Sequence, residues 1–308
     1  MTNQQLEAIV ARALPGDRVS DARALPGDRY ALALAGGERL NAQAFGTPQT
    51  AATATAALRL LRAEVDLPIP QLRASDTEGS TVGVPYVLTS EVSGEPLAQA
   101  LPRLADEQLY RLGRRLGEIV CRIHRLACER YGSLTDDSIA AADERGYVLA
   151  RLERDLRRCQ ELGLLDRRVS ADLTAWFERG FKPLSRQPAL VYGGMSLNTI
   201  LVRLSGNSWS VSGLLGWEQA LGWCPAWDHV SFLDTTDEQG YFGLRVGYGN
   251  GYDENTTRSY EQVREHAMAP YRLLLHLQRM QEAHAGGQLA ESEQRRGTLR
   301  GLMRFLDT

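Results

Sequence analysis

Apolar residues recur every three or four positions in long stretches of the chain beyond residue 104. One such face, which predicts a long amphipathic helix, consists of Leu109, Leu112, Leu116, Ile119, Ile123 and Leu126. The same spacing predicts a second helix over residues 148–162 and a third over residues 173–181. Residues 260–306 also have a helical pattern, with a break at Gly286 and Gly287. This part of the chain is therefore expected to be mainly helical.

Short apolar runs between turn-forming residues dominate the first part of the chain. They predict strands over residues 30–34, 38–45, 71–75 and 85–90. The first two runs flank Gly36 and Gly37, which is typical of a β-hairpin turn. Residues 50–63 are rich in Ala and Leu and predict a helix, which the prolines of Asp66–Pro70 end. We expect a five-stranded or similar antiparallel sheet with this one helix.

A loop at residues 91–96 marks the expected boundary between two lobes. Residues 1–91 are expected to form a β-rich lobe, and residues 92–308 a larger helical lobe. Short runs in the second lobe predict further strands over residues 189–192, 199–202 and 209–215. The expected fold class is therefore α+β. The octapeptide ARALPGDR occurs at residues 11–18 and 22–29, and we interpret it as a local duplication whose second copy enters the fold.

Composition is that of an ordinary soluble globular protein, with 308 residues, 43% hydrophobic and 24% charged. A net charge of -3 lacks the basic excess of a nucleic-acid-binding protein. No apolar run is long enough to span a bilayer, and Met1–Ala11 lacks the basic and apolar regions of a signal peptide. We therefore expect a cytoplasmic protein with neither a nucleic-acid nor a membrane partner. None of the cysteines forms a CxxC pair, so no metal site is expected.

Five segments, in order along the chain, resemble landmarks of the aminoglycoside phosphotransferases and their relatives. They are Asp66–Pro70, Pro85–Gly94, Leu116–His124, Ala189–Val202 and Val211–Glu218. Ala189–Val202 is similar to the family's catalytic loop, and Val211–Glu218 is similar to its metal-binding strand. Pro85–Gly94 is similar to the hinge between the family's lobes. The resemblance covers roughly residues 25–275 and implies a bilobal protein-kinase-like fold.

The resemblance also implies that residues needed for phosphoryl transfer have been replaced. The family's catalytic-loop Asp falls on Gly194, and the preceding His falls on Tyr192. The principal metal-binding Asp falls on Gly216, whereas the metal-side Asn is retained as Asn198. Glycine has no side chain to orient an acceptor hydroxyl or to bind Mg²⁺. The base and the principal metal ligand are therefore expected to be missing.

The first lobe lacks the family's phosphate-binding groups in the same way. The phosphate-anchoring cation of the family falls on Gln43, two residues before Phe45. Lys182, the only lysine of the chain, lies far outside this lobe. The family's glycine-rich turn is reduced to Leu25–Arg29, with Gly27 at its centre. Mg-ATP is therefore not expected as a cofactor.

These losses predict a pseudokinase that acts as a binding or partner protein for a small molecule, a peptide or another enzyme. Two alternatives stay open. The first is a repurposed enzyme in which Tyr192, His124 and Glu218 supply acid–base chemistry of the cyclase or lyase type. This alternative rests on an analogy with kinase-like homologues that occur in bacterial natural-product and peptide-modification pathways. The second is a residual phosphotransferase that uses Glu218 and Asn198.

Structural roles are expected for other residues near these segments. His124 lies beside the apolar face of its helix, where a hydrogen-bonded structural histidine is the commoner role. Asp228 is expected to bond the backbone around the segment that resembles a catalytic loop. The glycine-rich segment Gly247–Tyr252 is expected to form a flexible loop.

Overall fold

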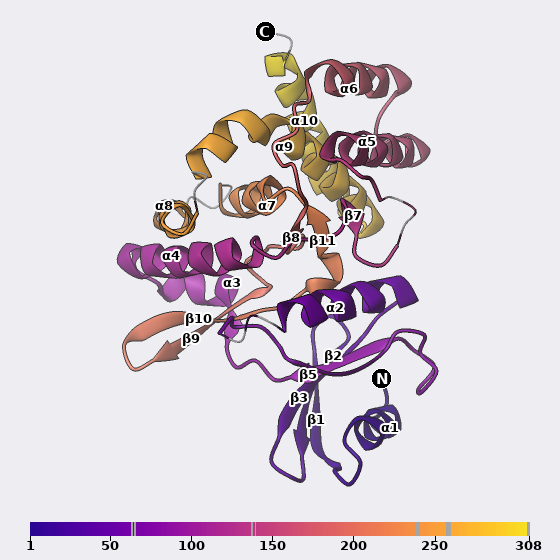
Figure 1. The fold of residues 1–308 in the computed structure, drawn as a ribbon, viewed down its shortest axis with the longest axis vertical. Helices are drawn as coiled ribbons and strands as arrows, with labels where there is room; N and C mark the ends of the chain where they lie inside the picture. Colours follow the sequence, from indigo (N-terminus) through magenta and orange to yellow (C-terminus); the bar gives the residue numbers. More distant parts are fainter. Residues whose placement is uncertain are drawn as a thin grey trace.

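The computed structural model describes residues 1–62, 64, 66–136, 138, 140–237, 241–256 and 260–306, without the side chains of residues 237, 260–268 and 303–306. Figure 1 shows a sheet-based lobe at one end of an elongated molecule and a larger, mainly helical lobe at the other. The α+β class and the order of the two parts agree with the sequence-based expectation.

The first lobe is built on a five-stranded antiparallel sheet with the strand order β1-β2-β3-β5-β4. Its strands are β1 (Val19–Leu25), β2 (Arg29–Leu34), β3 (Arg39–Ala44), β4 (Leu72–Asp76) and β5 (Tyr86–Ser90). Helix α2 (Pro48–Leu61) begins with Thr47 as its N-cap and a proline in its first turn. The expected sheet and this helix are confirmed.

The expectation of a single helix in the first lobe is wrong, because α1 (Asn3–Ala13) precedes the sheet. Thr2 caps this helix and exchanges hydrogen bonds with Gln5 in a capping box. The apolar side chains at helical spacing are buried in a core cluster with the sheet, and they are Leu6, Ile9 and Val10. Both the N-cap and the helical spacing were present in the sequence, but the helix is only 11 residues long and has only three large apolar residues.

The two copies of the octapeptide ARALPGDR adopt different structures. The copy at residues 11–18 ends helix α1, whereas the copy at residues 22–29 forms most of β1 and the turn into β2. Gly16 and Gly27 have positive φ angles of 98° and 74° at corresponding positions of the two turns. Both copies therefore belong to the fold, and their neighbours decide between helix and strand.

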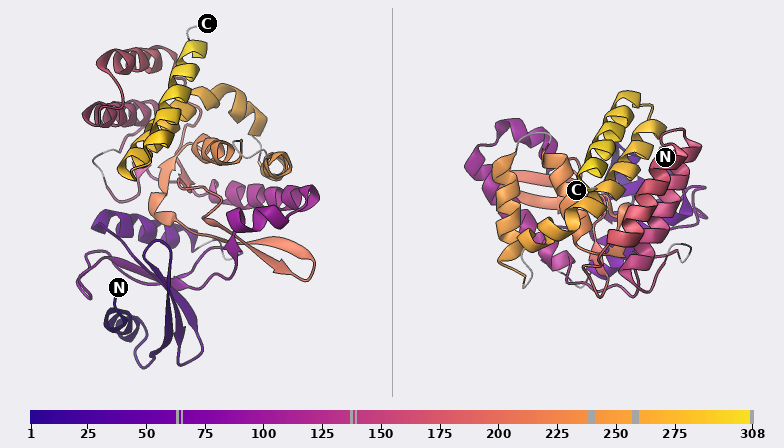
Figure 2. Two further views of the ribbon diagram at one scale, coloured as in Figure 1. Left: turned by 180° about the vertical axis from the view of Figure 1, so that it is seen from behind. Right: turned by 90° about the horizontal axis from the view of Figure 1, so that it is seen from above.

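The second lobe combines helices with two small sheets. Its helical segments are α3 (Leu97–Ala100), η1 (Leu101–Arg103), α4 (Asp106–Ile123), α5 (Glu144–Glu161), α6 (Arg167–Gly180), η3 (Trp217–Gln219), α7 (Ala226–Asp237), α8 (Phe242–Asp253), α9 (Tyr260–Ala285) and α10 (Leu289–Leu306). One sheet has the order β10-β9-β6 and the other β7-β11-β8. Their strands are β6 (Glu95–Pro96), β7 (Gly132–Ser133), β8 (Ala189–Val191), β9 (Ile200–Ser205), β10 (Ser208–Leu214) and β11 (Leu221–Trp223). Figure 2 shows α5, α6, α9 and α10 at the end remote from the first sheet.

Within the described part of the chain, none of the helices has the length and apolar character needed to cross a bilayer.

Helices α4 and α8 pack closely, and the expectation of a flexible loop at Gly247–Tyr252 is wrong. This segment belongs to α8. A Cβ atom on Gly247 or Gly251 would overlap backbone atoms of α4. A Cβ atom on Gly113 or Gly117 would overlap backbone atoms of α8 in return. The glycines therefore serve the close approach of two helix backbones, which offsets their low helix propensity.

One hydrophobic core joins the two lobes. It contains Leu58 and Leu61 of α2 together with Leu116 of α4. Tyr192 and Trp217, from the segments between β8 and β11, belong to the same cluster. This shared core fixes the segment that resembles a catalytic loop against the first lobe.

Candidate functional site

The segment that resembles a catalytic loop lies between the lobes. It follows β8 through residues 192–199 into the β9–β10 hairpin, and the chain then forms η3 against α2. A cavity of about 40 Å³ lies at this junction, which we call the interlobe cavity. Its polar lining residues are Arg29, Asn41, Gln43, Thr89 and Glu218. This volume admits a few water molecules, whereas pockets for small-molecule ligands usually measure several hundred Å³.

Asp228, in the first turn of α7, holds the backbone of this segment. Its carboxylate accepts hydrogen bonds from the backbone N–H groups of Tyr192 at 2.7 Å and Gly193 at 2.8 Å. It also lies 3.0 Å from Nε2 of His124, whose Nδ1 lies 3.0 Å from the hydroxyl of Tyr252. The His124 side chain is only 3% exposed. The backbone hydrogen bonds expected of Asp228 are confirmed, and both ring nitrogens of His124 have hydrogen-bond partners.

Tyr192 fills the space beside Gly216, where the principal metal ligand of the family is expected. Its fully buried ring lies 4.7 Å from that of Trp217, and its hydroxyl donates a hydrogen bond to the carbonyl of Leu215. A Cβ atom on Gly216 would lie 3.7 Å from this hydroxyl and 3.1 Å from the methyl group of Thr199. Gly216 also has a φ angle of 89°, which disfavours any side chain. The position therefore has no carboxylate and little room for one.

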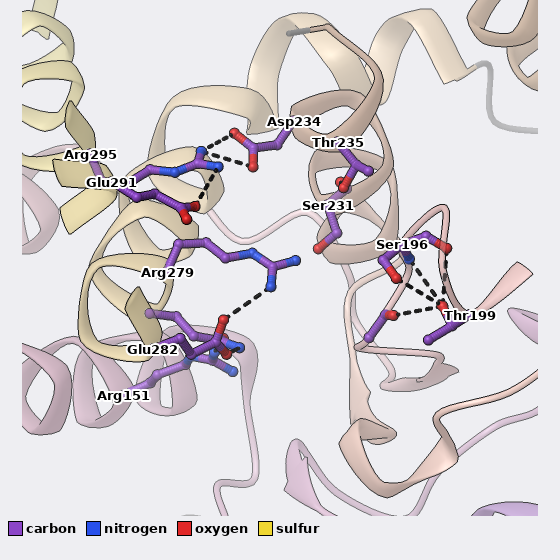
Figure 3. A network of polar contacts seen from close by, with 12 residues as sticks. Arg151, Ser196, Thr199, Ser231, Asp234, Thr235, Arg279, Glu282, Glu291 and Arg295 are labelled. Carbon is purple, nitrogen blue, oxygen red and sulfur yellow. Dashed lines mark hydrogen bonds and ion pairs between the residues drawn. The ribbon is translucent and has the colours of Figure 1, made fainter. Parts of the chain in front are cut away.

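The side chain of Thr199 bonds back to Ser196 of the same loop, residues 192–199, as Figure 3 shows. Its hydroxyl accepts a hydrogen bond from the backbone N–H of Ser196 and lies within donating distance of the Gly194 carbonyl, both at 3.2 Å. The neighbouring Asn198 is exposed and does not line the interlobe cavity, whereas Glu218 does. The two residues of the residual-phosphotransferase hypothesis are therefore not brought together at this cavity.

Gln219 lies over Gly194, the residue on which the resemblance is expected to place the family's catalytic Asp. A Cβ atom on Gly194 would meet the Gln219 side chain at 3.1 to 3.3 Å. Gln219 is exposed, so its carboxamide is free to move away. A carboxamide donates and accepts hydrogen bonds, but it does not act as a base toward a hydroxyl group.

Arg29 and Glu218 place opposite charges in the interlobe cavity. The strand register sets Arg29 of β2 opposite Gln43 of β3, so a cation lies next to the residue on which the resemblance is expected to place the family's phosphate-anchoring cation. The Nε group of Arg29 donates to the carbonyl of Pro26 at 3.0 Å. Burial raises the pKa of Glu218, and the positive charge of Arg29 partly offsets this shift. Asn41 Oδ1 is buried without a hydrogen-bond partner among the described residues.

Only some of the candidates from the sequence meet at the interlobe cavity. Gln43 and Gly216 line it, together with Glu218. The expected nucleotide-site residues that do not line it are Gly27, Gly194 and Asn198. Sequence reasoning missed Arg29, because its place opposite Gln43 depends on the register of two strands. No three His, Cys, Asp or Glu side chains in the described ranges are grouped so as to hold a metal ion.

A sequence profile described as the phosphotransferase enzyme family matches residues 28–266. The chain belongs to this family. The resemblance to aminoglycoside phosphotransferases is thereby confirmed. A search of curated protein sequences gives no significant match.

Solved structures with the same fold extend over nearly the whole chain. A Ralstonia eutropha protein, provisionally assigned as an aminoglycoside phosphotransferase, has a TM-score of 0.73 at 15% identity, and the match covers 99% of this chain and 98% of that one. A mutant of aminoglycoside 2'-phosphotransferase-IIIa in complex with GDP has a TM-score of 0.66 at 17% identity, with 98% and 97% covered. A thermostable mutant of APH(4)-Ia with AMP-PNP and hygromycin B has a TM-score of 0.66 at 15% identity, with 97% and 98% covered. These likenesses confirm the bilobal, kinase-like fold.

Proposed function

We propose that this protein is a cytoplasmic pseudokinase, a binding or partner protein that does not transfer phosphate from a nucleotide. The observation that carries the proposal is the pair Gly194 and Gly216 at the family's two carboxylate positions, with Tyr192 and Thr199 against Gly216. Phosphoryl transfer depends on Mg²⁺ between the phosphate oxygens and on a carboxylate that orients the attacking hydroxyl. Neither glycine can supply these groups.

The size of the interlobe cavity supports the same proposal. A volume of about 40 Å³ is far below that of a pocket for a nucleotide. Enlarging it would require Leu58 of α2 to separate from the segment around Trp217, and both residues line the cavity and belong to the shared core. Separation of buried apolar surface opposes such an opening.

The acid–base alternative has less support, because two of its three candidate residues are already engaged. Burial raises the pKa of Tyr192, and its hydroxyl is committed to the carbonyl of Leu215. Both ring nitrogens of His124 have hydrogen-bond partners. Glu218 alone of the three lines the interlobe cavity.

Formation of nucleoside diphosphate tests the proposal. Purified protein is incubated with Mg-ATP or Mg-GTP, alone and with kanamycin or hygromycin B, which are ligands named for two similar structures. We expect no diphosphate above a protein-free control, while an active member of the family gives a clear signal. Magnesium-dependent diphosphate release that Glu218→Gln abolishes, and that the exposed-site control Glu153→Gln retains, would overturn the proposal.

A further inference from the structure

Two adjoining hollows form a groove on the first lobe and the hinge, which we call the outer groove. The larger, of about 780 Å³, lies between α2 and β4. The smaller, of about 530 Å³, lies between the hinge residues 90–93 and β10. Ile69 and Gln71 line both hollows, so the two hollows adjoin at these residues. The outer groove shares only Leu58 and Pro70 with the interlobe cavity, and it is many times larger.

The larger hollow has an apolar floor. Its buried leucines are Leu58, Leu61 and Leu67. Apolar side chains that remain partly exposed in the hollow are Leu14, Ile69 and Leu72. Partly exposed aliphatic groups around a hollow gain stability when another apolar side chain covers them.

The charges of the outer groove that are left without an ion pair are positive. Its two carboxylates are neutralised by ion pairs of 2.8 and 2.5 Å, namely Glu64–Arg122 and Glu91–Arg39. Arg73 is paired with Glu38 at 2.7 Å. The arginines of its lining that have no ion pair within the described ranges are Arg59, Arg62 and Arg203. The groove is therefore complementary to a partner that carries carboxylates.

Edge strands border both hollows. Strand β4 ends the five-stranded sheet, and β10 ends the sheet β10-β9-β6. The N–H group of Leu214 at the end of β10 donates to the carbonyl of Pro68 at 2.9 Å, so the chain's own backbone already occupies this end of the edge. The part of β10 that lines the smaller hollow is residues 210–212. Farther along β10, the hydroxyl of Ser212 lines the smaller hollow and is buried without a hydrogen-bond partner among the described residues. Sheet edges of this kind bind extended peptides through main-chain hydrogen bonds.

We propose that the outer groove binds an extended, acidic peptide segment of a partner protein. Alternate apolar side chains of the peptide would cover the leucine floor, because side chains of an extended chain point to alternate faces. Its carboxylates would meet Arg59 and Arg62 at one end and Arg203 at the other. Its backbone would pair with the edge of β10. This inference goes beyond the proposed function and does not depend on it, since the groove would bind peptide whether or not the interlobe cavity transfers phosphate.

A peptide selection tests the inference even though the partner protein is unidentified. A random library of displayed peptides, about twelve residues long, is selected on the wild-type protein and, in parallel, on the variant Arg59→Ala/Arg62→Ala/Arg203→Ala. We expect peptides rich in Asp, Glu and Leu to be enriched on the wild type only. Synthetic copies with a fluorescent label should bind the groove variant at least roughly tenfold more weakly and lose affinity as salt is added.

Two controls make the result specific to the groove. Arg167→Ala/Arg168→Ala removes exposed arginines of α6 far from the groove and should leave peptide affinity unchanged. Ile69→Glu places a carboxylate where the two hollows meet and should abolish binding. Hydrogen exchange should slow at residues 210–212 when peptide is bound.

Several results would overturn the inference. They are the absence of enriched peptides, enrichment without an excess of acidic residues, and equal affinity for the wild type and the groove variant. Thermal melting of each variant shows whether it is folded, so that loss of binding is not mistaken for loss of structure. Diphosphate release is measured separately, and its outcome leaves the peptide result unaffected.

Discussion

The interlobe cavity and the outer groove differ in size, charge and packing. The cavity measures about 40 Å³, and beside it a Cβ atom on Gly216 would lie 3.1 Å from the methyl group of Thr199 and 3.7 Å from the hydroxyl of Tyr192. The outer groove has hollows of about 780 and 530 Å³ and arginines without an ion pair in the described ranges. The difference indicates that within this fold the space for a ligand is small at the interlobe cavity and larger at the outer groove. Function has to be argued from each site, and the fold alone does not supply it.

The largest expected effect on stability concerns the packing of Tyr192 against Trp217, beside the cavity. Tyr192→Ala removes a fully buried ring that lies against Trp217, and should lower the free energy of unfolding by roughly 3–5 kcal/mol. Ile69→Ser, at a partly exposed position of the outer groove, should lower it by only about 1 kcal/mol. Urea denaturation of both variants checks the contrast. Equal losses would mean that the cavity is no better packed than the groove.

The next largest effect on stability is expected at Gly216, where a comparison of two substitutions separates backbone strain from lack of space. Gly216→Asp meets both a φ angle of 89° and the methyl group of Thr199 at 3.1 Å, and should be destabilising by roughly 2–4 kcal/mol. Gly206→Asp is the matched control, because its φ angle is 59° but no atom lies within 4 Å of its added Cβ. This control should lower the free energy of unfolding by about 1 kcal/mol. Gly194→Asp, which meets only the movable Gln219 side chain, should lose no more than this control.

If Gly216→Asp and Gly206→Asp lower the free energy of unfolding equally, there is room for a side chain beside Gly216. A metal ligand could then be restored there by one substitution.

Two carboxyl groups should respond to pH with opposite signs. Burial alone would raise the pKa of Asp76, but hydrogen bonds from Thr81 and Ser80 outweigh it and lower the pKa to about 2. The charged Asp76 therefore stabilises the fold at pH values above 3.8, its ordinary pKa. This contribution to stability is lost as the pH falls toward about 2. Asp76→Asn should be less stable by about 1–2 kcal/mol at neutral pH, and the difference should vanish in acid.

Glu218 is expected to behave in the opposite way, because burial raises its pKa. Its charged form is disfavoured in the folded protein, so it destabilises the fold as pH rises above its ordinary value of 4.5. Glu218→Gln should therefore be slightly more stable than the wild type at neutral pH, and this gain should disappear in acid. Urea denaturation across pH measures both variants, and a destabilised Glu218→Gln protein would indicate a charged pair of Glu218 with Arg29 that stabilises the fold.

The smallest expected effect on stability belongs to the arginines of the outer groove. Arg59→Ala/Arg62→Ala should change the free energy of unfolding by no more than about 0.5 kcal/mol, since both side chains are exposed and have no ion pair within the described part of the chain. A large loss of stability would show that these arginines support the fold, and would remove the argument that they are available to a partner.

Periodicity and turn residues predicted most helices and strands, because local patterns carry that information. Helix α1 was missed although its local signals were present, because it is short. A second failure came where tertiary contacts reverse the local signal. The glycines of Gly247–Tyr252 favour a loop locally, yet α4 packs against them and makes them helical. The octapeptide ARALPGDR shows the same limit, since identical residues end helix α1 in one copy and form strand β1 in the other.

The sequence predicted the positions of the candidate site residues along the chain, but not their neighbours in space. The resemblance singled out Gly194, Gly216 and Gln43 along the chain, but their side-chain neighbours depend on how the loops fold. The positions of Arg29 opposite Gln43 and of Gln219 over Gly194 follow from strand register and from the path of η3. Neither is encoded in a short motif.

Calorimetric titration of the wild-type protein with Mg-ATP and with Mg-GTP tests the central claim most directly. The account predicts no saturable binding at millimolar nucleotide, because Gly194 and Gly216 bring no carboxylate to a metal and Tyr192 occupies the adjacent space. Binding that requires magnesium and disappears with a chelator would contradict it. Glu218 would then be the first residue to examine as the metal ligand.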